Sequence, residues 1–150
     1  MRKKIIVFMM LMVGVAVHAQ QGLSIDALFD GRVIPQERMV ETRVRGKSIA
    51  KYQLSYYRSL RLHATGQEAG QLRQLLAQDA EHSIDMRTSR KNPHRWDTWT
   101  CKLQMPSAGG KNRYLCYQEQ WDKAHEQAEL TIIYMEGAVD SLEELEELLK

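Results

Sequence analysis

One stretch limits the fold of this chain more than any other, because it has the pattern of a β-hairpin with a cysteine on each arm. Residues 106–112 (Pro-Ser-Ala-Gly-Gly-Lys-Asn) form the densest cluster of turn-forming residues in the sequence. The flanking runs 96–103 and 113–117 are rich in aromatic, β-branched and apolar residues, which favour strands. We therefore expect two antiparallel strands joined at this turn.

The two cysteines define an expected register for this hairpin. A turn centred just after Ala108 places Cys101 directly opposite Cys116, with Trp99 on the same face. We therefore expect a Cys101–Cys116 disulfide, which would stabilise the fold by roughly 3 kcal/mol in the chain-entropy model. A slip of one residue would destroy this geometry, and the alternative is a pair of free thiols.

The N-terminus predicts export. Three basic residues at 2–4 precede an almost wholly apolar run at 5–17, and Val17 and Ala19 are small residues at the positions that signal peptidase reads. We expect residues 1–19 to be a signal peptide, cleaved between Ala19 and Gln20, which leaves the mature protein periplasmic or secreted. The apolar run is too short for a comfortable membrane span, and the alternative is an uncleaved anchor.

Removal of this leader changes the charge balance. The leader contains three of the 21 Lys and Arg residues and none of the 19 acidic ones, so the mature chain has 18 basic and 19 acidic residues, a formal charge of −1. This near neutrality removes the support for a general affinity for nucleic acid or acidic membranes. Residues 20–150 are long enough for a single domain with one core.

Apolar periodicity predicts three further strands. Residues 39–45 and 54–63 alternate between apolar and polar, and 130–135 are apolar on both faces, as in a central strand. Arg58 falls among the apolar set of its strand. The functional interpretation of Arg58 is an anion-binding residue, and the preferred interpretation is an arginine that is paired or snorkels to solvent.

Helices are predicted outside these strand runs. A short one is expected at 24–31. A longer one begins at the capping box of Thr65 and Glu68 and ends near residue 82, and a last one follows Ser141. We therefore expect an α+β domain, in which an antiparallel sheet of four or five strands carries two main helices packed on one face.

Three parts of the chain resemble a known group of proteins. They are the opening at 21–31, the stretch at 46–60, and the ending at 130–137 with 141–142. Together they resemble small exported domain-of-unknown-function proteins of Gram-negative anaerobic bacteria. The resemblance spans most of the mature chain. It implies export and a compact α+β domain, and it implies no reaction and no site residues.

Motifs of known chemistry are absent from the sequence. It has no phosphate-binding glycine loop, no Gly-x-Ser-x-Gly elbow and no His-Glu-x-x-His, and we expect no cofactor. Asp79, His82 and Asp85 are three residues apart and could form a partial metal site or an acid/base site, although a solvated helix end is the preferred interpretation. Paired carboxylates for glycoside chemistry could also include Asp97 and Glu119, but any such choice would be arbitrary.

The most prominent charged feature is a basic stretch at 87–95, interpreted as an exposed loop. Arg87, Arg90, Lys91 and Arg95 could meet an anionic partner there, and a solvated loop is the alternative. The leading functional hypothesis is an exported, non-enzymatic binding or accessory domain that acts on another envelope or secreted protein. A small metal-dependent or acid/base hydrolase at Asp79, His82 and Asp85 is the alternative.

Overall fold

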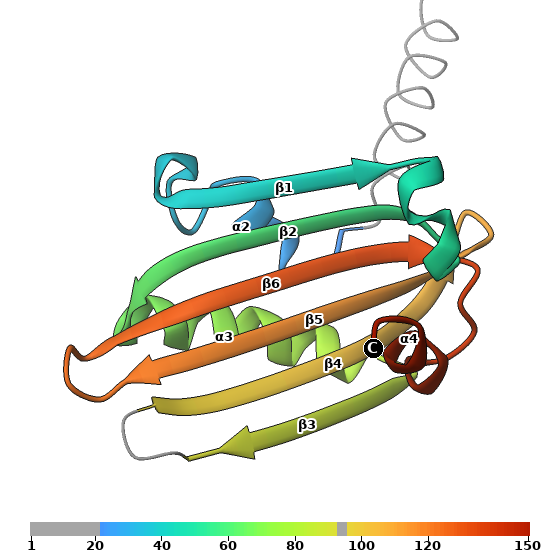
Figure 1. Cartoon of the computed structure of the whole chain (residues 1–150). Helices are drawn as coiled ribbons and strands as arrows, with labels where there is room; N and C mark the ends of the chain where they lie inside the picture. The colour runs from blue at the N-terminus through green and yellow to red at the C-terminus, as the bar shows by residue number, and fades with distance from the viewer. Residues whose placement is uncertain (1–21, 93–95) are drawn as a thin grey trace, which may run out of the picture.

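The computed structural model describes residues 22–92 and 96–150, which form one antiparallel sheet of six strands in the order β1-β2-β6-β5-β4-β3 (Figure 1). The predicted leader and its cleavage point lie outside the described residues. In chain order the elements are α2 (Asp26–Phe29), η1 (Gln36–Arg38), β1 (Met39–Arg45), η2 (Lys47–Tyr52), β2 (Leu54–Thr65), α3 (Gly66–Glu81), β3 (Asp85–Lys91), β4 (Trp96–Ala108), β5 (Lys111–Asp122), β6 (Gln127–Gly137) and α4 (Leu142–Leu148).

The sheet has a hydrophobic core on each face. Leu130 and Ile132 of β6 pack with α3 on one face, whereas Met135 of β6 packs with α4 on the other. Figure 1 shows α3 behind the sheet and α4 in front of it. The predicted α+β layer of four or five strands with two helices on one face is therefore wrong. Central strands that are apolar on both faces need apolar groups packed against both faces, and each of the two helices packs against one face.

The sixth strand was not expected, because β3 was interpreted as part of a basic loop. All seven of its residues are exposed, and its sequence, Asp-Met-Arg-Thr-Ser-Arg-Lys, shows no apolar alternation. β3 forms the edge of the sheet and pairs with β4 alone. Backbone hydrogen bonds to a neighbour hold such a strand, and charged side chains on an edge discourage pairing with other chains. Its composition is consequently the same as that of a loop.

Other local predictions are confirmed. β1 has the bounds that the alternation predicts, and α3 begins at the expected capping box. In that box the Glu68 amide donates to the Thr65 hydroxyl at 3.2 Å, and the Thr65 amide donates to the Glu68 carboxylate at 3.1 Å. Arg58 is paired, as the preferred interpretation held: its guanidinium donates to Glu41 at 2.5 Å and lies over the Phe29 ring at 4.7 Å.

The capping box predicts a dependence of stability on pH. Two hydrogen bonds from Arg38, at 2.7 and 2.8 Å, and one from the Thr65 amide lower the pKa of Glu68 to about 2. Because the folded-state pKa is depressed, the stabilisation is complete above the ordinary glutamate pKa of about 4.3 and is lost as the pH falls towards 2. Urea unfolding should therefore show Glu68→Gln to be less stable than wild type at pH 7, with the difference vanishing near pH 2. A difference that stays constant with pH would contradict this assignment.

The hairpin forms, but its register differs by one residue from the prediction. Gly109 and Gly110 make a two-residue turn with φ of 59° and 74°, the conformation in which glycine is favoured. This turn is centred one residue later than predicted, which moves the pairing by two residues, and a bulge between Met105 and Ala108 takes one of them back. Cys101 therefore faces Tyr117 rather than Cys116. Side chains alternate along a strand, so this shift places Cys101 in the core on the α3 face and Cys116 beside the core on the α4 face.

Both cysteines are free thiols, so the predicted Cys101–Cys116 disulfide is wrong for this structure. Burial raises the pKa of both thiols, that of Cys116 to about 12. Thiols without thiolate character react slowly. Iodoacetamide in denaturant, with no reductant present, should therefore modify both cysteines, as read by mass spectrometry, whereas the folded protein should react slowly. An unreduced, denatured protein that takes up no label would show instead that the bridge exists.

Candidate functional site

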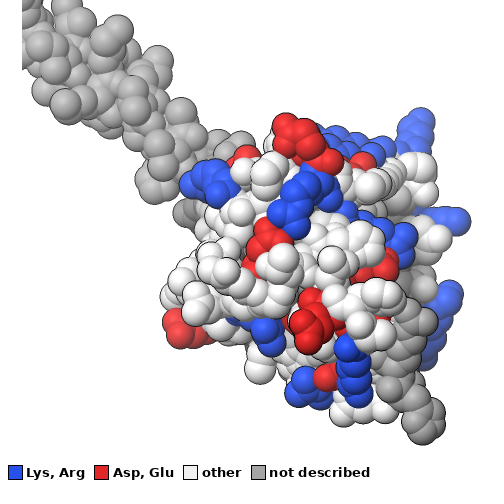
Figure 2. All heavy atoms as spheres, turned by 90° about the vertical axis from the view of Figure 1, so that its left-hand side faces the viewer, with Lys and Arg blue, Asp and Glu red and all other residues white. Residues whose placement is uncertain are grey.

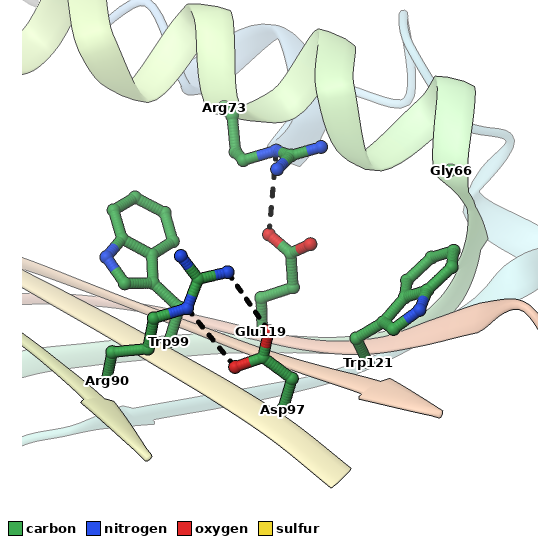
Figure 3. A pocket seen from close by; sticks show the side chains of 7 residues that line it. All are labelled: Gly66, Arg73, Arg90, Asp97, Trp99, Glu119 and Trp121. Carbon is green, nitrogen blue, oxygen red and sulfur yellow. Dashed lines mark hydrogen bonds and ion pairs between the residues drawn. The ribbon is translucent and has the colours of Figure 1, made fainter. Parts of the chain in front are cut away.

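A hollow of about 430 Å³ opens between α3 and the strands β3, β4 and β5. We call it the tryptophan pocket, and Figure 3 shows the side chains that line it. The lining residues are Gly66, Arg73, Arg90, Asp97, Trp99, Glu119 and Trp121. Its volume falls in the range of small-molecule sites, which is about 300–1,000 Å³.

Two tryptophans on neighbouring strands form the apolar walls of the pocket. Trp99 of β4 and Trp121 of β5 are half-buried and pack against the core on the α3 face. Trp99 contacts the ring of Tyr117 edge-on, with the ring centroids 5.5 Å apart. In Figure 3 the two indoles stand on either side of Glu119, with α3 above them. Both rings are thereby held by the sheet and the core rather than by a loop.

Gly66 keeps the space beside Trp121 open. It is the first residue of α3, and a Cβ at this position would lie 3.5 Å from Cη2 of the Trp121 indole. This is an ordinary van der Waals distance, so a single methyl group would fit. A longer side chain would extend along the indole into the pocket.

Four charged side chains complete the lining as two pairs of opposite charge. Arg90 donates to both oxygens of Asp97, at 3.2 and 3.0 Å, and this bidentate contact raises the pKa of Arg90. Nε of Arg73 lies 3.7 Å from Oε2 of Glu119. The two arginines and two carboxylates leave the pocket without net charge.

Tyr117 fixes the position of the Glu119 carboxylate by a hydrogen bond. Its hydroxyl donates to Oε2 of Glu119 at 3.0 Å, and its side chain is fully buried. Burial, together with the adjacent carboxylate, raises the pKa of Tyr117 far above its ordinary value. The phenol therefore remains a hydrogen-bond donor to Glu119 throughout the physiological pH range.

Three of the four basic residues singled out from the sequence lie in the described part of the chain, and they do not share one face. Because β3 is a strand, Arg90 lies on the α3 face and lines the tryptophan pocket, whereas Arg87 lies on the opposite face, 3.3 Å from Glu146 of α4. Lys91 is exposed at the end of β3. Arg95 lies outside the described residues. Figure 2 shows positive and negative side chains interspersed over the end of the molecule where β5 turns into β6.

The three residues of the hydrolase alternative have separate environments. The carboxylate of Asp79 is buried and accepts the backbone N–H groups of Ser24 at 2.6 Å and Ile25 at 2.9 Å. His82 is exposed at the end of α3, and Asp85 is exposed on β3, 3.9 Å from Arg87. Within residues 22–92 and 96–150 there is no cluster of three or more His, Cys, Asp or Glu side chains able to hold a metal ion.

Sequence reasoning missed most of the pocket because of the hairpin register. The expected pairing set Trp99 opposite Gln118, but in the structure Trp99 faces Glu119. The one-residue shift brings Glu119 and Trp121 to the face that carries Trp99. The i, i+2 spacing of Glu119 and Trp121 was a visible signal that they share a face. The predicted strand ended at residue 117, however, so both residues lay outside it, and Arg90 was expected in a loop rather than on β3.

The chain thus has a single antiparallel sheet, one long helix on one face of it, and a charge-balanced aromatic pocket beside that helix. The chain belongs to a family of unknown function (DUF6108), whose sequence profile matches residues 12–149. No curated protein and no solved structure matches the chain. No helix in the described part of the chain has the length and apolar character that a membrane crossing requires.

Proposed function

We propose that this protein is an exported, non-enzymatic binding domain and that the tryptophan pocket is its binding site. The observation that carries the proposal is the pocket itself, where two indoles held by the core flank a carboxylate whose position is fixed by a buried tyrosine. Sites of this kind bind with little reorganisation, because their walls are already in place. Export rests on the leader pattern at residues 1–19.

The hydrogen bonds and ion pairs made by the carboxylates of Asp97 and Glu119 favour ligand binding over hydrolysis. A glycosidase-type mechanism needs one carboxyl group that gives up a proton and a second that acts as base or nucleophile. Asp97 is held by a bidentate arginine, and Glu119 accepts from Tyr117 while Arg73 lies alongside. Both groups are thus arranged as hydrogen-bond acceptors of fixed position. This is the arrangement that recognition of a ligand requires.

The size of the pocket also bears on the partner expected from the sequence. A specific protein interface buries about 800 Å² on each partner, whereas this hollow accommodates one small chemical group. Another envelope or secreted protein would therefore be recognised through a group that it carries. We therefore propose recognition at the tryptophan pocket, which includes Arg90 of β3, rather than at Arg87 and Lys91 of the same strand.

Native mass spectrometry of the protein, produced from its complete sequence and recovered from the cells that express it, tests this proposal. After incubation with the small-molecule fraction of an envelope digest, the wild type should carry an adduct, and its mass should show that residues 1–19 have been removed. Gly66→Met should lose the adduct, because the new side chain occupies the space beside Trp121. The control is Gln67→Met, which makes a similar change at an exposed neighbouring position. An adduct that persists in Gly66→Met, or none in any fraction, would refute the binding role of the pocket.

A further inference from the structure

We infer that the tryptophan pocket selects a neutral, polyhydroxylated ring, which in biological material means a pyranose unit of a glycan. This inference rests on the proposed function and adds to it the chemical class of the ligand. It follows from three properties of the described lining: its charge balance, its unused hydrogen-bonding capacity, and the placement of its two indoles.

The charge balance disfavours an ionic ligand of either sign. An anion placed between the indoles would lie near the carboxylates of Asp97 and Glu119, and a cation would lie near the guanidinium groups of Arg73 and Arg90. Either ion would be attracted by one member of each pair and repelled by the other, so the lining offers it little net electrostatic attraction. A neutral ligand can enter while both pairs remain intact.

Three of these groups, Glu119, Arg73 and Arg90, retain capacity for hydroxyl groups. Asp97 does not, because each of its oxygens already accepts from Arg90 and from the Asn92 amide. Each carboxylate oxygen can accept about two hydrogen bonds, and an arginine offers five N–H donors. Arg90 uses its Nε and Nη2 atoms on Asp97, so its remaining donors are available. Nε of Arg73 donates to the Ala69 carbonyl at 3.4 Å and lies 3.7 Å from Glu119, which leaves the two Nη groups of Arg73. Adjacent hydroxyls on a sugar ring present a donor and an acceptor side by side. Carboxylate and guanidinium groups of fixed orientation are suited to bind such a pair at two points.

The indoles supply the apolar part of the recognition. A pyranose carries its hydroxyls around the edge and exposes C–H groups on its faces, which pack favourably on the flat face of an aromatic ring. Trp99 and Trp121 stand on opposite sides of Glu119 in Figure 3. A ring that enters beside Glu119 can pack one face on an indole while its edge meets the charged groups. Amino acids and amines lack this combination of apolar faces and a hydroxylated edge.

Titration of the full mature protein with soluble ligands of four classes tests the inference, with tryptophan fluorescence and calorimetry as readouts. The classes are neutral oligosaccharides, sugar phosphates, zwitterionic amino acids, and quaternary amines. At least one neutral oligosaccharide should bind with an affinity that differs little between low and high salt. Trp121→Ala and Gly66→Met should each weaken this binding about tenfold or more. Trp96→Ala is the matched control, because alternation places Trp96 on the other face of β4, and it should bind as the wild type does.

The outcomes separate the inference from the function on which it rests. Suppose that a charged ligand binds, that Trp121→Ala and Gly66→Met both weaken this binding, and that no neutral oligosaccharide binds. The sugar inference is then overturned, while the pocket remains the binding site. Neutral oligosaccharide binding that is equally weakened in Trp96→Ala would place the sugar elsewhere and overturn the inference as well. If no class binds and the envelope digest leaves no adduct, both the inference and the proposed function fail. Thermal unfolding of each variant shows whether a loss of binding reflects a loss of folding.

Discussion

Replacing Gly137 with alanine should destabilise this protein by about 3 kcal/mol or more, or prevent its folding. Gly137 ends β6 and pairs with Leu54 of β2 on one side and Asn112 of β5 on the other. A Cβ at this position would lie 2.2 Å from the carbonyl oxygen of Gln53 and 2.8 Å from the Cα of Leu54. Both are backbone atoms, which cannot rotate away as the end of a side chain can.

The surrounding backbone leaves little room to relieve this clash. Gln53 already has the left-handed conformation, with φ of 57°, and its carbonyl oxygen accepts the N–H of Ala138 at 2.9 Å. A shift of Gln53 large enough to admit a methyl group would break this bond and disturb the start of β2. The close approach of two chain segments is therefore the reason that glycine occupies position 137.

Urea unfolding followed by circular dichroism measures the effect, with Gly70→Ala as the matched control. Gly70 lies within α3, and the nearest atom to an added Cβ there is Nη2 of Arg73, at 3.9 Å. Alanine should leave stability unchanged at this site or raise it by up to about 1 kcal/mol, because glycine is a poor helix former. Equal unfolding midpoints for Gly137→Ala and wild type would show that the backbone at Gln53 and Leu54 leaves room for a methyl group at position 137.

The second large effect is expected at Asp79, whose replacement by alanine should destabilise the protein by about 2–4 kcal/mol. The side chain is 3% exposed and accepts the N–H groups of Ser24 and Ile25, which lie more than fifty residues earlier in the sequence. Alanine would leave these donors without their acceptor, at about 1–3 kcal/mol for a buried one. Asp79 thereby joins the end of α3 to the segment that carries the buried core residues Leu28 and Ile34.

Chemical unfolding and limited proteolysis together test this assignment. Asp79→Asn keeps one oxygen acceptor and places an NH₂ group towards an N–H donor, so its loss should be intermediate. Asp85→Ala, at an exposed position on β3, should change stability by no more than about 0.5 kcal/mol. In Asp79→Ala, cleavage should begin near residues 22–34 before the sheet unfolds. Wild-type stability for Asp79→Ala would contradict the role of this carboxylate in anchoring the N-terminal segment.

Features decided within a few residues were predictable. The capping box of Thr65 and Glu68 starts α3 because both hydrogen bonds join groups three residues apart. β1 was predicted with its observed bounds because alternation is a property of the strand itself. The hairpin was likewise predicted, since Gly109 and Gly110 supply the turn conformation locally.

Features that depend on partners distant in the sequence could not be predicted from local patterns. β3 has no apolar pattern and is a strand because β4 offers it backbone hydrogen bonds. The predicted disulfide failed because one bulge moves Cys116 to the other face of the sheet from Cys101. The same shift brings Glu119 opposite Trp99 and so creates the tryptophan pocket.

The sequence by itself determined where turns occur, where helices begin, and which segments are apolar enough to be central strands. It also carries the leader pattern on which the proposal of export rests. Only the tertiary structure decided the number of strands, the face on which each helix packs, and the residues that meet in the pocket. The physical reason is that side-chain direction along a strand reverses at every residue, so a single bulge, invisible in composition or periodicity, reassigns every side chain beyond it to the opposite face.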